Sequence, residues 1–207
     1  MKDFDFKETF LNPIFKGNPI TVLVLGICSS LAVTVQLQGA CVMGLSVAIV
    51  TAFSSLICSL LRNTIPNRIR IIVQLVVVAL MVILVDQFLK AYAYQVSKTL
   101  SVYIGLIITN CILMGRLEAF AMQNKPWPSF LDGIGNGVGY AMILIIVAFF
   151  REFFGTGALL NIQIIPESFY EAGYLNNGLM LMTPAAFILI ACIIWYQRAK
   201  DKSLQEK

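Results

Sequence analysis

The sequence predicts an all-α integral membrane protein with six transmembrane helices, arranged as two inverted three-helix repeats in which helices 1 and 4 are short or broken. Composition is the first observation behind this prediction. Of the 207 residues, 58% are hydrophobic and only 13% are charged, whereas about a quarter of the residues of a soluble domain are charged. The second observation is that apolar segments recur along the chain between polar or proline-broken loops. The third is that two of these segments are short and carry one central cysteine each.

The six spans follow from the length of the apolar segments, because a helix needs about 20 residues to cross the hydrocarbon core. We expect an N-terminal cytoplasmic segment over 1–18, a membrane domain over 19–197 and a cytoplasmic tail over 198–207. The repeat halves are expected at about 19–97 and 98–197. The expected spans are 19–35, 40–61, 71–89, 100–115, a fifth that follows the glycine-rich stretch 132–139 and ends at 150, and 178–196.

The first and fourth spans are expected to be interrupted and to form the working site. Cys28 lies near the middle of the first and Cys111 near the middle of the fourth. Corresponding interrupted segments in two halves of a membrane protein indicate its binding site. We expect helix breaks near Gly26 and near Gly105 or Gly115, with both cysteines near the bilayer centre across a pseudo-two-fold axis.

The distribution of Lys and Arg predicts the orientation. If six spans alternate, nearly all of these residues fall on the side that holds both termini, and the other side holds only Lys90, Lys98 and Arg151. Cytoplasmic loops carry the excess of Lys and Arg. Both termini are therefore expected in the cytoplasm. The net charge of +4 is interpreted as this orientation signal and not as a nucleic-acid footprint.

The chain contains no histidine and five cysteines. The missing histidine excludes Ser-His catalysis and histidine-ligated zinc or haem sites, so a transition metal held by this chain alone would need Cys, Asp or Glu. Cys28 and Cys111 then have two interpretations: buried free thiols, or part of a metal site that lacks two of the four thiolates of an iron–sulfur cluster. The remaining cysteines have no matched positions and are interpreted as packing residues: Cys41, Cys58 and Cys192.

Asp86 and Asp132 are candidate functional residues, because acidic groups near the membrane core are functional hypotheses by default. Both fall close to expected span ends, which leaves a solvated carboxylate or, for Asp132, a helix N-cap as the alternative. Arg116 and Glu118 are interpreted as a short-range pair at the cytoplasmic surface. The glycines of 133–139 lack a preceding strand and a GK[ST] motif, so we interpret them as sites of close helix packing.

Long motifs surround both cysteines. They are LGICSSLAVT at 25–34, LRNTIPN at 61–67, IITNCILMGR at 107–116, EAFAM at 118–122 and PSFLDGIGNG at 128–137. Together they resemble the D subunits of the Na⁺-translocating NADH:quinone reductases. The E subunits of the Rnf ferredoxin:NAD⁺ oxidoreductases are similar around the cysteines, but Ser29, Ser30 and the 62–67 loop favour the quinone-reductase family.

The resemblance implies a membrane component of an enzyme complex in the bacterial inner membrane that passes electrons from NADH to ubiquinone and exports Na⁺. It implies that Cys28 and Cys111 hold one [2Fe-2S] cluster together with a homologous E subunit of opposite orientation. FMN, riboflavin, FAD and the NADH site would belong to other subunits of the complex, which are the A, B, C and F subunits besides E. Asp132 and Asp86 are then candidates for the Na⁺ pathway. The alternatives are an Rnf-type role or an inverted-repeat secondary transporter.

Overall fold

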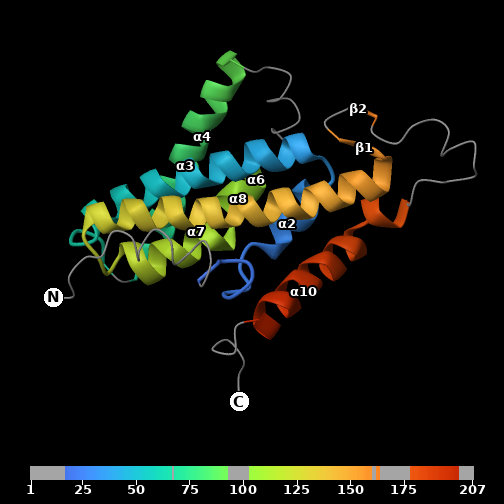
Figure 1. Ribbon diagram of the computed structural model, residues 1–207. Coiled ribbons are helices and arrows are strands. Elements are labelled where there is room, and N and C mark those ends of the chain that lie inside the picture. The colour runs from blue at the N-terminus through green and yellow to red at the C-terminus, as the bar shows by residue number, and fades with distance from the viewer. Residues whose placement is uncertain (1–16, 67, 93–102, 160–161, 164–177, 201–207) are drawn as a thin grey trace, which may run out of the picture.

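The computed structural model describes residues 17–66, 68–92, 103–159, 162–163 and 178–200. Their regular secondary structure is helical apart from one short antiparallel strand pair (Figure 1). The all-α class is therefore confirmed. In chain order the elements are α2 (Ile27–Val33), α3 (Leu37–Leu61), α4 (Arg70–Tyr92), α6 (Ile104–Ile108), α7 (Cys111–Arg116), the π-helical turn η1 (Leu117–Ala121), α8 (Pro126–Thr156), β1 (Ala158–Leu159), β2 (Ile162–Gln163), the 3₁₀ turn η2 (Gly178–Leu181) and α10 (Thr183–Lys200).

Three helices of the described chain are long and apolar enough to cross a membrane: α3, α4 and α8. They correspond to the second, third and fifth expected spans. The first span is represented by α2, the fourth by α6 and α7, and the sixth by η2 and α10. Most of the expected terminal segments, 1–18 and 198–207, and the start of the fourth span lie outside the described residues.

Helix α8 begins earlier than the sequence suggests. Pro126 occupies its first turn and Lys125 is its N-cap, because the ring of proline fixes a helical φ and needs no amide partner at that position. Asp132 consequently lies inside the helix, where its side chain is buried. The interpretation of Asp132 as an N-cap is wrong.

Helices α3 and α8 pack against each other along their length with small residues at the contact (Figure 1). A Cβ atom built on Gly137 would lie 2.4 Å from the Cα atom of Ala48. This distance is too short for two carbon atoms that are not bonded to each other. Close packing at Gly133 and Gly137 is therefore confirmed. The contacts run antiparallel and pair Gly44 with Ala141, Ala48 with Gly137, and Ala52 with Gly133.

The first and fourth expected spans are interrupted. α2 follows Gly26, whose φ of 78° lies in the left-handed region, so the expected break near Gly26 is present. The second break lies at Thr109 and Asn110, and the expectation of Gly105 or Gly115 is wrong. Asn110 has an extended backbone and its side chain accepts a hydrogen bond from the Ile112 N–H, which caps α7. This cap, and not glycine flexibility, starts the second half-helix.

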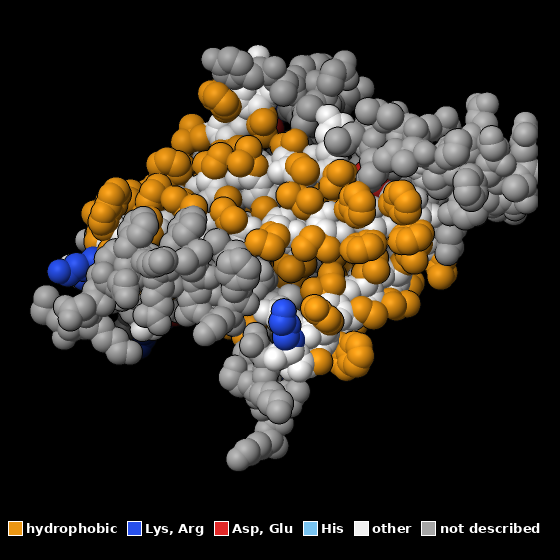
Figure 2. All heavy atoms as spheres, in the orientation of Figure 1, with side chains coloured by type: hydrophobic (Ala, Val, Ile, Leu, Met, Phe, Trp, Pro, Cys, Tyr) orange, Lys and Arg blue, Asp and Glu red, His pale blue; other side chains and the backbone are white. Residues whose placement is uncertain are grey.

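The outer faces of the bundle are apolar. Figure 2 shows hydrophobic side chains spread over the visible face of the long helices, with Lys and Arg only at the left edge and near the lower end of α10. α4 is the most outward of the long helices: only 22% of its most apolar window is buried. A face of this kind is suited to lipid or to another apolar protein surface.

The first prediction concerns the contact of α3 with α8. Gly137→Ala should destabilise the protein by about 1–3 kcal/mol, because its new methyl group overlaps the Ala48 backbone. The thermal unfolding midpoint of the purified protein in detergent measures this loss. Gly105→Ala is the matched control, since a Cβ atom there meets nothing within 4 Å. Equal midpoints for both variants would show that the close contact does not limit stability.

Candidate metal centre

Cys28 and Cys111 lie at the starts of the two half-helices that follow the breaks. Cys28 is in the first turn of α2 and Cys111 is the first residue of α7. The Cys28 and Cys111 side chains interact with each other, so the two thiols are neighbours. Two cysteines from different halves of the sequence are thus brought to one place by the two interruptions.

The peptide group of Gly26 adds a hydrogen bond to this pair. Its N–H donates to the Cys111 sulfur at 2.8 Å. The left-handed backbone of Gly26 directs the N–H to the sulfur, and a Cβ atom there would lie 2.4 Å from the Ile112 Cδ1 atom. A residue with a side chain at position 26 would therefore be both strained and in collision.

The pair of thiols is an incomplete ligand set in this chain. Cys28 is exposed and Cys111 is partly exposed, so further ligands could reach them from outside. Within the described ranges, no group of three or more His, Cys, Asp or Glu residues could hold a metal ion. Cys58 is buried in the core, as expected of a packing residue, but Cys41 and Cys192 are exposed, so the packing interpretation is wrong for them within this chain.

Two hydroxyl groups behind the thiols were not identified from the sequence. The Tyr140 hydroxyl lies 2.7 Å from Ser29 Oγ, and Ser29 donates to the Gly26 carbonyl at 3.0 Å. Both side chains are fully buried. Ser29 lies inside the first cysteine motif, which is a signal for it, but nothing in the sequence around Tyr140 connects α8 with the cysteines.

Asp132 forms a buried ion pair with Arg116. Arg116 donates from Nη2 and Nε to the two carboxylate oxygens at 2.5 and 3.0 Å, and Asn136 donates a third hydrogen bond at 3.1 Å. The expected pair of Arg116 with Glu118 is wrong, because residues two apart on a helix do not face each other. Glu118 instead forms an ion pair with Arg70 and accepts a hydrogen bond from Gln74.

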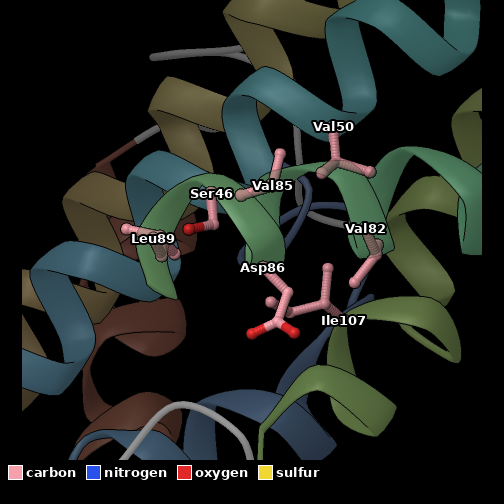
Figure 3. Close-up of a pocket in the computed structure, with 7 residues that line it drawn as sticks. All are labelled: Ser46, Val50, Val82, Val85, Asp86, Leu89 and Ile107. Carbon is pink, nitrogen blue, oxygen red and sulfur yellow. The ribbon is translucent and has the colours of Figure 1, made fainter. Parts of the chain in front are cut away.

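Asp86 lies on α4 beside a small pocket between α3, α4 and α6. Its carboxylate is 2.5 Å from Lys90 Nζ, one helical turn later. Figure 3 shows Asp86 on the wall of this pocket together with Ser46 and Ile107. Asp86 pairs with Lys90 on α4, whereas Asp132 on α8 pairs with Arg116 on α7. Among the contacts of the described residues, neither carboxylate meets the Cys28 and Cys111 thiols.

Comparison with known proteins shows the family of this chain. The chain matches the family described as Rnf-Nqr subunit, membrane protein, over residues 6–194. It is 55% identical to the D subunit of the Na(+)-translocating NADH-quinone reductase of Psychromonas ingrahamii over 197 residues, which cover 95% of this chain and 94% of the relative. The D subunits of the same enzyme from Yersinia pestis and Yersinia pseudotuberculosis are 52% identical over 203 residues, which cover 98% of this chain and 97% of theirs. The resemblance seen in the motifs is thereby confirmed, and the chain belongs to the Rnf-Nqr family of membrane protein subunits.

Proposed function

We propose that this chain is the D-type membrane subunit of a Na⁺-translocating NADH:quinone reductase and helps to hold an iron–sulfur cluster inside the membrane. The observation that carries the proposal is the proximity of the Cys28 and Cys111 thiols at the starts of two half-helices, with the Gly26 N–H donating to the Cys111 sulfur. The names of the relatives support the complex. The thiol pair supports the part that this chain plays in it.

The residues at the site fit such a cluster. Thiolates are the soft ligands that iron–sulfur clusters require, and a [2Fe-2S] cluster takes four of them. This chain supplies two, and the exposure of Cys28 leaves room for two more from outside. The Gly26 N–H stabilises negative charge on the Cys111 sulfur. When bound, the cluster would carry one electron at a time between the other redox centres of the complex.

A homologous E subunit, in the opposite membrane orientation, is the proposed source of the other two thiolates. An inverted repeat within this chain supports such a pairing, because two copies of one architecture can meet with their breaks face to face. The small residues of the α3 and α8 contact recur with the same spacing in the two helices. They are Gly44, Ala48 and Ala52 in α3, and Gly133, Gly137 and Ala141 in α8.

Two arginines support the same six-helix inverted repeat. Arg62 follows α3 and donates to the carbonyl of Asn124 at 2.8 Å, beyond the end of the α7 segment. Arg151, near the end of α8, donates to the Leu31 carbonyl at 3.2 Å and to Thr34 at 2.6 Å, at the end of α2. An arginine at the end of α3 thus binds the segment after α7, and an arginine near the end of α8 binds the end of α2.

The A, B, C and F subunits complete the proposed complex and hold the FMN, riboflavin, FAD and NADH sites. An Rnf-type role is the second candidate within the family, and the names of the relatives favour the quinone reductase. A secondary transporter is the candidate from another class. The thiol pair disfavours it, because coupling ions such as Na⁺ prefer oxygen ligands.

The second prediction tests the cluster. Cys28→Ser and Cys111→Ser should each lose the cluster and block electron flow to quinone, because a serine hydroxyl is a poor, hard ligand for this iron. Iron and acid-labile sulfide per complex, with electron paramagnetic resonance after reduction, measure the loss. NADH oxidation by early-acting artificial acceptors should persist, because it precedes this step.

Cys58→Ser is the buried control for this experiment, and Cys41→Ser and Cys192→Ser are the exposed controls. All three should keep the iron content of the wild type. Wild-type iron content and quinone reductase activity in Cys28→Ser and Cys111→Ser would contradict the proposed cluster ligands.

The third prediction concerns the proposed Na⁺ pathway. Asp132→Ala should weaken Na⁺-stimulated turnover more than Asp86→Ala. Both carboxylates are buried in long apolar helices, but Asp132 accepts three hydrogen bonds from Arg116 and Asn136, whereas Asp86 pairs with one half-exposed lysine. Steady-state activity against Na⁺ concentration measures both. Arg116→Gln is the control, since it breaks the same ion pair and keeps the carboxylate. An unchanged Na⁺ dependence in both aspartate variants would leave Asp132 and Asp86 with structural roles only.

The fourth prediction is the orientation in the inner membrane. The basic loop 62–70 lies at the same end of the molecule as the segment that precedes α8, because Arg62 bonds Asn124 and Arg70 bonds Glu118. Basic loops remain in the cytoplasm, so reporter fusions after Arg70 and after Lys202 should both report a cytoplasmic position. A periplasmic signal from either fusion would contradict the proposed topology.

A further inference from the structure

A chain of three hydrogen bonds connects the Tyr140 hydroxyl to the Cys111 sulfur. The Gly26 N–H donates to the sulfur at 2.8 Å, the Gly26 carbonyl accepts from Ser29 Oγ at 3.0 Å, and Ser29 Oγ lies 2.7 Å from the Tyr140 hydroxyl. Ser29 and Tyr140 are fully buried. Tyr140 therefore reaches the thiol pair from α8 through the two residues that form the first break.

The direction of these hydrogen bonds follows from the single hydrogen of the serine hydroxyl. Ser29 gives that hydrogen to the Gly26 carbonyl, so its oxygen must accept at the other contact, and the Tyr140 hydroxyl is the donor. The Tyr140 donation strengthens the next bond, from Ser29 to the Gly26 carbonyl. Loss of the Tyr140 hydroxyl would leave the Ser29 oxygen buried without its donor.

Both peptide groups of Gly26 are held by this network. The N–H on one side meets the Cys111 sulfur, and the carbonyl on the other side meets Ser29. The Tyr140 ring also packs on this residue, since a Cβ atom on Gly26 would lie 3.2 Å from Tyr140 Cε2. The orientation of residue 26, and with it that of the N–H, therefore depends on Ser29 and Tyr140 together with the Ser30 N–H, which also donates to the Gly26 carbonyl at 3.2 Å.

The second break is built differently. There the Asn110 side chain caps α7 by accepting from the Ile112 N–H. Alignment of the two cysteines places Ile112, which has no hydroxyl group, opposite Ser29. When Gly44, Ala48 and Ala52 of α3 are superposed on Gly133, Gly137 and Ala141 of α8, Thr51 becomes the position equivalent to Tyr140. The Thr51 hydroxyl donates to the Val47 carbonyl within its own helix at 2.6 Å. Tyr140 also interacts with the Asn110 side chain, but among the described hydrogen bonds the one through Gly26 reaches the Cys111 sulfur.

We propose that Tyr140 and Ser29 are positioning residues that hold the Gly26 N–H on the Cys111 sulfur and so raise the reduction potential of the centre. This inference rests on the proposed function of the two cysteines. Reduction adds one electron and therefore negative charge at the sulfurs. An N–H donor stabilises that added charge, and hydrogen bonds to the sulfurs are among the factors that set cluster potentials.

The test is a redox titration of the purified complex, followed by the electron paramagnetic resonance signal that Cys28→Ser removes. Tyr140→Phe should keep iron and acid-labile sulfide at wild-type amounts. At a fixed potential the ratio of reduced to oxidised centre should fall about tenfold, which is about 59 mV towards negative values for a one-electron couple. Ser29→Ala should shift the midpoint in the same direction, and the double variant should add little.

Thr51→Val is the matched control, because it removes a fully buried hydroxyl of α3 that does not reach the cysteines. Its midpoint should equal that of the wild type. Wild-type midpoints in both Tyr140→Phe and Ser29→Ala, with iron retained, would overturn the positioning role and leave the cluster ligands standing. If Tyr140→Phe loses iron, a wild-type midpoint potential in Ser29→Ala would by itself overturn the positioning role. A wild-type complex without the signal would instead refute the proposed function itself.

Discussion

The close approach of α3 and α8 is the constraint on which the rest of the structure depends. Glycine and alanine at the contact let the two backbones come nearer than ordinary side chains allow. The short helices α2 and α7 have too few residues to be stable alone. They are held by this pair: Arg151 of α8 binds the end of α2, and Arg62 after α3 binds the segment that follows α7.

The half-helices α2 and α7 matter for the site because of where they begin. Because α2 and α7 start at the breaks, their first turns carry N–H groups that no helical carbonyl can satisfy. One of the two breaks turns an amide toward a sulfur through Gly26, and the other satisfies its amide with the Asn110 side chain. Equivalent places in the two halves are therefore built with different chemistry. The proposed repeat would thus be symmetric in its helices and asymmetric at its site.

Much of this architecture could be predicted from the sequence because long apolar segments are a strong signal. The expected second and third spans end within a few residues of α3 and α4. The break at Asn110 is harder to predict than one at glycine, because an asparagine N-cap ends one helix and starts another without positive φ. The pairing of Arg116 with Asp132 could not be predicted, because it joins two elements whose approach is a tertiary property. The place of Tyr140 behind the cysteines escapes prediction for the same reason.

The π-helical turn η1 sets the direction in which the backbone between α7 and α8 faces. A π turn contains one residue more than an α turn, and one residue corresponds to about 100° of rotation around a helix. The segment after the turn presents the Asn124 carbonyl to both Ser59 and Arg62. Removal of one residue from Leu117–Ala121 would restore the α-helical phase and turn that carbonyl away from both donors. This short stretch is thus less tolerant of length change than of substitution.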